Sequence, residues 1–432
     1  YQIDSKTVIR GGYGWGYDLG TFGSTFGHNV TQNPPVLSNQ NTTPPNNFTP
    51  VFTLANGPST LAPVTVGPNG TFLLPNGVNP KFRPPEVTLP TTYMYNLALQ
   101  RQVTNKISLT AAYVGNSNRH GFIGTGQTTN PNEAVFIPGN SNTNLGRPYY
   151  GLYGWTQDLS YYCNCSNEHY NALQVSFRIN NWGGWGLQGS YTYQNQYGDG
   201  WAYDSNYYFL YGPRAMGQGN TGTLPKQQWT IAQTYDIPYG HGRKYGASVN
   251  RAVDAALGGW TMSGVMTYYS GFPFAPSLEN YGNLQTSGPN IGLGGGQPNT
   301  GPNNRPDLGA GNPYAGSTGN RFCWFACTPT SLGYQGNLNA AFLIPKANTF
   351  GNYPINVLYG PIFIQQDFSI MKTFHFTERI GFTLRTDASN VFNHTNLGGP
   401  NGDLQSASVG QITSIAGGGT MRRLQFSGTL RF

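Results

Sequence analysis

The sequence is poor in charge. Asp, Glu, Lys and Arg together make up only 9% of the 432 residues, whereas soluble globular proteins carry about 25%. Acidic residues are the scarcer sign, with 16 against 23 Lys and Arg, and the basic residues are scattered along the chain. A nucleic-acid-binding protein needs a basic patch or stripe, so the sequence argues against nucleic acid as a partner.

Long apolar runs are also lacking. No stretch of 18 or more consecutive apolar residues occurs in the sequence, which excludes a transmembrane helix. A membrane protein is not excluded, because the strands of a transmembrane β-barrel alternate outward and inward residues and therefore keep the mean hydropathy low.

Patterns that carry enzyme chemistry are missing as well. The six histidines are dispersed and show neither His-x-x-x-His nor His-Glu-x-x-His spacing, which are metal-site patterns. No Ser–His–Asp set or paired carboxylates stand out among so few acidic residues. We therefore expect neither an enzyme nor a bound cofactor.

What the sequence does contain is aromatic residues and turn formers. Tyr, Phe and Trp make up 14% of the chain, beside 60 Gly and 31 Pro. A disordered chain would be rich in Gly and Pro but poor in aromatics. This combination instead indicates many short strands that are joined by long, ordered loops.

The strongest pattern is a period-two alternation of apolar and polar residues, which is typical of β-strands. In the last nine residues, Leu424, Phe426 and Leu430 alternate with polar residues up to Phe432. The same alternation recurs along the chain and predicts about ten strands, near 5–17, 91–103, 107–113, 173–179, 185–194, 226–237, 260–268, 362–374, 378–391 and 424–432.

The connections between these strands alternate between short and long. Short turns are predicted at 104–105, 181–183 and 374–378, and a longer connection at 238–258 contains one short helix that ends at Gly258-Gly259. Long loops are predicted near 18–90, 118–166, 198–224, 272–360 and 393–419. Short periplasmic turns and long extracellular loops characterise outer-membrane barrels. We therefore predict an all-β fold, an antiparallel transmembrane β-barrel that occupies residues 1–432 as a single domain.

The alternation assigns side chains to the two faces of the barrel wall. Aromatic residues cluster near strand ends, where girdles at the lipid–water interfaces place them: Tyr13, Trp15, Tyr17, Tyr93, Trp185, Trp229, Trp260 and Tyr268. Polar residues on the opposite positions are expected to line the lumen, either solvating it or contacting a plug or passing solute: Gln174, Arg178, Gln188, Arg385 and Asp387.

The four cysteines form two close pairs, Cys163 with Cys165 and Cys323 with Cys327. Because the cell surface is oxidising, disulfides are expected. A Cys-x-Cys ring is small and strained, so we expect each pair to bond to the other and staple two loops together. The alternative is a four-cysteine metal site with His169 nearby.

Several segments resemble TonB-dependent-receptor-like outer-membrane proteins of the Oar type. The segments 4–14 and 255–264 resemble barrel strands of that family, 385–397 is similar to its penultimate strand and the Phe-Asn-His loop after it, and 410–413 and 422–432 match its end. The resemblance implies a larger barrel with an N-terminal regulatory-like domain and a plug. The chain therefore looks like the C-terminal part of such a receptor, and Phe432 resembles the signal that the barrel-assembly machinery recognises.

Two functions follow as expectations. One is a receptor in the bacterial outer membrane whose long loops capture a solute such as a saccharide or a peptide, with the TonB system as a partner through parts beyond this chain. The other is a structural or adhesive surface protein that self-assembles as a homo-oligomer through its loops or strand edges. In both, the lipid bilayer is a partner.

Overall fold

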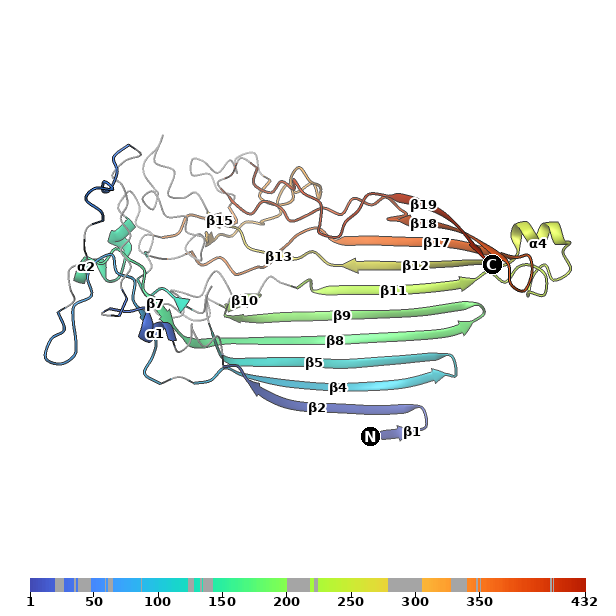
Figure 1. Ribbon diagram of the computed structural model, residues 1–432, viewed down its shortest axis with the longest axis horizontal. Helices are drawn as coiled ribbons and strands as arrows, with labels where there is room; N and C mark the ends of the chain where they lie inside the picture. Colours follow the sequence, from blue (N-terminus) through green and yellow to red (C-terminus); the bar gives the residue numbers. More distant parts are fainter. Residues whose placement is uncertain are drawn as a thin grey trace.

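The fold is dominated by one large antiparallel β-sheet, seen in a computed structural model of the chain (Figure 1). The structure describes residues 1–19, 27–34, 36–37, 48–58, 60, 65–86, 88–122, 128–132, 134, 143–199, 218–220, 224–278, 305–327, 340–346, 349, 351–404, 406 and 408–432. Among these residues, no helix is long and apolar enough to cross a membrane.

Ten long strands make up the sheet, in agreement with the number predicted from the alternation. They follow one another in chain order, and each pairs antiparallel with the next: β2 (Thr7–Tyr17), β4 (Thr91–Thr104), β5 (Ile107–Phe122), β8 (Asn164–Trp182), β9 (Trp185–Asp199), β11 (Gln227–Asp236), β12 (Trp260–Tyr269), β17 (Phe363–His375), β18 (Gly381–Ser389) and β19 (Arg423–Arg431). Two short strands, β1 (Gln2–Asp4) and β10 (Gln218–Asn220), pair with β2 and β9.

The register of the strands places most of the large apolar residues on one face of the sheet and most of the polar residues on the other. Ile231 pairs with Gly189 on one side and Met266 on the other, whereas its neighbour Thr230 pairs with Ser190 and Thr267. Because side chains on paired positions share a face, one face of the sheet is aliphatic and aromatic and the other is polar. We call them the apolar face and the polar face.

Glycines on the apolar face allow aromatic rings to lie flat across a neighbouring strand. Gly189 faces Phe177 in the ladder, and a Cβ atom at this position would collide with the Phe177 ring. An aromatic side chain that lies over a glycine covers the exposed backbone of the strand and fills the space above it. The strand glycines therefore serve packing here rather than flexibility.

Short and long connections lie at opposite ends of the sheet (Figure 1). Tight turns join β4 to β5, β8 to β9 and β17 to β18 at one end. At the same end the connection from β11 to β12 contains helix α4 (Arg251–Leu257), whose first turn is capped by the Asn250 side chain accepting from the Val253 amide. The short helix predicted in this connection is thus confirmed.

Three strands extend further than the sequence indicated, and one of them, β9, runs to Asp199 instead of ending near 194. β5 continues to Phe122 and β8 begins at Asn164, so both ends of the loop predicted at 118–166 are strand. The register joins Asn118 to Glu168 and Gly121 to Ser166, with irregularities between them. The alternation is lost in this polar stretch, but the backbone ladder needs no apolar face to continue above the membrane.

The first and the last strand in the order of the sheet form its two margins. β1 forms one margin and β19 the other, and among the described residues no pairing joins them. A strand margin carries unsatisfied N–H and C=O groups, which cannot face lipid. The sheet shown here therefore needs further strands, or its own two margins, to close a barrel.

The long loops contain short elements and a core of their own. Leu278, Phe325, Phe342, Leu404 and Val409 are buried together in one cluster. Backbone bonds from Trp324 to Gly410 and from Ile412 to Arg321 join the loop before β17 to the loop before β19. The elements of the long loops are α1 (His28–Thr31), β3 (Lys81–Phe82), β6 (Thr128–Thr129), a 3-10 turn (Thr143–Gly146), α2 (Tyr150–Tyr153), β7 (Ser160–Tyr162), β13 (Pro273–Phe274), β14 (Asp307–Leu308), β15 (Phe342–Leu343) and β16 (Leu358–Tyr359).

Candidate functional site

The polar face of the sheet is hollowed. A depression of about 710 Å³ is lined by residues of β8, β9, β11, β12, β17 and β18, among them Arg178, Gln188, Arg385 and Asp387. Two further hollows of about 400 and 320 Å³ also include Arg178. Arg178 borders all three hollows, so they adjoin one another along the polar face, and we refer to them together as the trough.

Charged groups in the trough are arranged in pairs and polar contacts. Arg385 forms an ion pair with Asp387 at 2.8 Å, and both side chains remain solvent-accessible. Arg178 donates from Nε to the Asn180 side chain at 3.0 Å. Arg10 of β2 donates to the Gln100 side chain of the paired strand β4, on the same face of the sheet. The trough is therefore accessible to solvent and lined by hydrogen-bonding groups, and it contains more cations than anions.

Four of the five residues expected in the lumen line this trough directly, and Gln174 lies on the same face, opposite Ala112 and Thr192. Asp367 is a charged trough residue that the sequence reasoning missed, and it accepts from the Asn390 amide at 2.8 Å and from the Gln365 side chain at 3.2 Å. Asp367 occupies one of the alternating polar-face positions of the strand predicted at 362–374, and this alternation was the signal that could have identified it.

All eight aromatic residues singled out from the sequence lie on the apolar face. Tyr13 pairs with Tyr95 and Trp15 with Tyr93 at the long-loop ends of β2 and β4. Two groups flank the middle of β11: the Trp229 ring lies 4.2 Å from Tyr191, and the Tyr235 ring lies 4.8 Å from Trp185. Tyr17, Trp260 and Tyr268 occupy the same face near strand ends.

The disulfide connectivity expected from the sequence is wrong. Each close pair bonds within itself: Cys163 to Cys165, with Cα atoms 5.2 Å apart, and Cys323 to Cys327, with Cα atoms 5.7 Å apart. Both separations fall in the ordinary range for a disulfide of about 4.4–6.8 Å. Cys165 also lies within β8 rather than in a loop. The loops are therefore not stapled to one another by disulfides.

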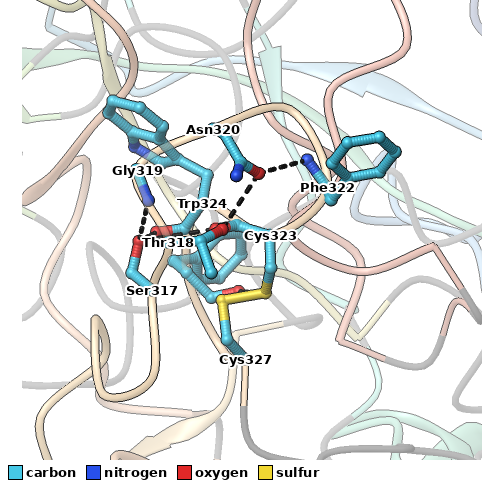
Figure 2. Close-up of a disulfide and its surroundings, with 9 residues drawn as sticks. Ser317, Thr318, Gly319, Asn320, Phe322, Cys323, Trp324 and Cys327 are labelled. Carbon is cyan, nitrogen blue, oxygen red and sulfur yellow. Dashed lines mark hydrogen bonds between the residues drawn. A yellow bond between two sulfur atoms is a disulfide. The ribbon is translucent and has the colours of Figure 1, made fainter.

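The Cys323–Cys327 bond closes a tight turn in the loop before β17 (Figure 2). Ala326 adopts a positive φ of 54° within this turn. Asn320 accepts from Thr318 Oγ1 and from the Phe322 amide, each at 2.9 Å. These hydrogen bonds organise the turn that precedes Cys323. Because all four cysteines are oxidised, they supply no thiolates for the alternative metal site, and no cluster of metal-binding side chains occurs among the residues described.

An aromatic cluster lies in the loop between β5 and β8. The rings of Tyr153 and Trp155 stack with centroids 4.7 Å apart, and Tyr149 lies 5.9 Å from Trp155. Trp155 donates from its indole to the Leu74 carbonyl at 2.9 Å, which connects this loop to the loop before β4. Tyr153 remains half exposed, so one aromatic face is available to solvent.

Polar residues join segments of the same loop by hydrogen bonds and an ion pair. Asn132 is fully buried and donates to the Gln157 carbonyl at 2.8 Å. Arg147 pairs with Asp158 at 2.9 Å, and the Asp158 side chain is still mostly exposed. The loop therefore carries both a half-exposed tyrosine ring for stacking and an exposed carboxylate for hydrogen bonding.

Two tyrosines belong to the buried core of the loops before β17 and β19. Burial raises the pKa of Tyr353 to about 12, and burial also raises the pKa of Tyr314. Tyr314 donates to the Tyr359 carbonyl at 3.2 Å and accepts from the Tyr359 amide at 2.7 Å. Both phenols are therefore neutral at physiological pH and act as structural groups.

Comparison with known families identifies the fold. The family model described as outer membrane beta barrel domain matches residues 1–425. The chain belongs to this family. It is therefore a β-barrel of the bacterial outer membrane, in contact with the lipid bilayer, and not an enzyme. A search of the curated proteins found no match.

Solved structures of outer-membrane transporters are similar to this barrel. The transporter YddB from Escherichia coli is 10% identical, with a TM-score of 0.38, over 82% of this chain and 34% of its own. BauA, the ferric preacinetobactin receptor from Acinetobacter baumannii, and Fiu, the ferric-catecholate import receptor from E. coli K12, are each 10% identical with TM-scores of 0.39. Both matches cover all of this chain, and they cover 35% of BauA and 34% of Fiu. The chain thus spans about a third of their length.

Proposed function

We propose that this barrel is the wall and outer-loop region of a receptor that captures a neutral, polar solute at the cell surface and admits it to a polar lumen. The observation that carries the proposal is the trough of hydrogen-bonding groups on the polar face, together with the buried loop core at the end away from the short turns. A purely structural wall needs neither.

The orientation follows from solvent physics. The apolar face, with aromatic groups toward both strand ends, meets the bilayer and its two interfaces. The polar face, with Gln174, Arg178, Gln188, Arg385 and Asp387, lines the lumen. The short turns face the periplasm, where Phe432 is available to the assembly machinery, and the long loops face outward.

The unpaired margins support a larger closed barrel. Because lipid cannot satisfy the free N–H and C=O groups of β1 and β19, we propose that further strands of the same protein complete the ring, as a C-terminal barrel segment requires. Coupling to the TonB system would then act through parts beyond this chain. The same margins favour a second function, assembly of copies by strand pairing; a particle mass larger than one polypeptide would identify it.

The aromatic cluster of the loop between β5 and β8 suits a saccharide or a peptide. Sugar rings and peptide groups stack on exposed aromatic faces and hydrogen-bond to groups such as the Asp158 carboxylate. An aromatic contact of this kind contributes about 0.5–1.5 kcal/mol. The scarcity of charge in the whole chain favours a neutral solute over an ionic one.

Replacement of Tyr153 by Ala tests this function. Arrays of neutral oligosaccharides and neutral peptides are incubated with the intact purified protein, and the dissociation constants of bound probes are measured. We expect one class to bind and Tyr153→Ala to weaken binding up to about tenfold, from the lost stacking of about 0.5–1.5 kcal/mol.

Tyr245→Ala is the matched control, because Tyr245 is equally exposed but lies at the opposite end of the barrel. This variant should bind as tightly as the unaltered protein. Failure of both probe classes to bind, or an unchanged dissociation constant in Tyr153→Ala, would contradict the proposal.

A further inference from the structure

Lys372 is a buried cation on the apolar face. It lies opposite Trp260 in the ladder between β12 and β17, one step from the end of the sheet that carries the short turns. An ammonium group on a lipid-facing surface is costly unless it is paired or reaches an interface. Yet Lys372 is only 4% exposed, so the protein itself surrounds this charge.

Helix α4 supplies the partners of Lys372. Its Nζ donates to the Asp254 carbonyl in the middle of α4 at 2.9 Å and to the carbonyl of Gly258, the C-cap of the helix. Carbonyls at a helix C-terminus carry partial negative charge and favour a cation. The Lys372 ammonium also lies 5.8 Å from the Trp260 ring and 5.1 Å from the Phe374 ring.

These contacts fix the position of the whole connection 238–258. The Trp260 indole donates to the Ala256 carbonyl at 2.9 Å, from the same apolar face. Further bonds join Ile237 to Trp260 and Gly259 to Tyr239. Because α4 is held against the apolar face, the connection lies at the outer perimeter of the barrel rather than across the lumen.

The exposed side chains of this connection are basic and apolar. Arg243, Lys244 and Arg251 are exposed, and the one acidic residue, Asp254, accepts from the His241 amide at 2.6 Å. Leu257 and Tyr245 are 56% and 55% exposed. Clustered cations beside exposed apolar groups are the pattern that binds anionic membrane surfaces.

We propose that the connection 238–258 binds the anionic phospholipid headgroups of the periplasmic leaflet of the outer membrane. Arg243, Lys244 and Arg251 contact the phosphates, while Leu257 and Tyr245 enter the headgroup region. Lys372 acts as a positioning residue, because it fastens α4 to the apolar face at the depth of that leaflet. This inference rests on the proposed orientation of the apolar face but not on solute capture.

Lipid retention tests the proposal on the intact protein. The protein is solubilised in mixed micelles with equal amounts of phosphatidylglycerol and phosphatidylethanolamine, and native mass spectrometry counts the retained lipids of each kind. We expect phosphatidylglycerol to be enriched, and ~0.5 M salt to reduce the enrichment because the charges are exposed. Each basic residue near an anionic surface strengthens binding about fivefold.

The decisive variant is Arg243→Gln/Lys244→Gln/Arg251→Gln, which should lose at least about tenfold in phosphatidylglycerol enrichment. A charge-matched control is Arg83→Gln/Arg119→Gln/Arg422→Gln, since these exposed arginines lie toward the long loops; it should retain the enrichment. Equal retention of both lipids by the unaltered protein, or unchanged enrichment in the first variant, overturns the proposal. If neither lipid is retained, the proposed orientation of the apolar face toward the bilayer is wrong instead.

Discussion

Arginine introduced at Ile231 should destabilise the barrel in a bilayer by about 2–4 kcal/mol, the cost of a cation near the middle of the membrane on the lipid-facing side. Ile231 lies on the apolar face between the aromatic pairs at Trp229 and Tyr235. The free energy of unfolding is measured by denaturant titration of the protein in phospholipid vesicles.

Thr230→Arg is the matched control, one residue away on the same strand but on the polar face. Its side chain enters a wet lumen, where an added cation costs little. We expect its free energy of unfolding to stay within about 1 kcal/mol of the unaltered protein. Equal losses in the two variants, or a larger loss at Thr230, would mean that the two faces have been assigned the wrong way round.

Phe342→Ala should remove the fold of the loops before β17 and β19 while leaving the barrel intact. Phe342 is fully buried, and its ring lies 5.1 Å from Tyr353 and 6.1 Å from Phe325. Truncating a buried Phe to Ala costs about 3–5 kcal/mol, which is a large share of what so small a core can supply. Limited proteolysis of intact cells should then cut these loops, and the gel shift on heating that reports a folded barrel should persist.

Phe322→Ala serves as the control in the same segment, because its ring is 67% exposed and lies 4.8 Å from the Arg321 guanidinium. Its proteolysis pattern should match that of the unaltered protein. If Phe342→Ala is as protease-resistant as Phe322→Ala, the cluster is not the core of these loops. If the barrel unfolds with them, the loops and the sheet form one cooperative unit.

The sheet could be predicted from sequence because its information is local. Along 260–268, every second residue is large and apolar or is glycine, and the structure gives β12 nearly the same bounds. The short helix in 238–258 carried a local signal of its own, the glycine stop at Gly258-Gly259. Local alternation also assigned Arg178 and Arg385 to one face and Trp229 to the other.

The loops could not be predicted in this way, because their core is assembled from distant segments. Leu278, Phe325 and Leu404 belong to loops with no periodicity, and only the folded structure brings them together. The disulfide error arose because only the ring strain of an isolated Cys-x-Cys was considered, whereas in the structure each close pair bonds within itself. Lys372 was missed since its partners lie more than a hundred residues earlier in the chain.

The orientation of the wall is the central claim, and spin-label accessibility along β11 tests it most directly. Single labels at positions 228–235 of the protein in phospholipid vesicles report collisions with oxygen, which concentrates in lipid, and with a water-soluble nickel chelate. We predict a period of two, with the labels at odd positions such as Ile231 accessible to oxygen and those at even positions such as Thr230 accessible to the chelate. Uniform accessibility along the strand, or the opposite alternation, would contradict the account of this chain as a barrel wall with its apolar face in lipid.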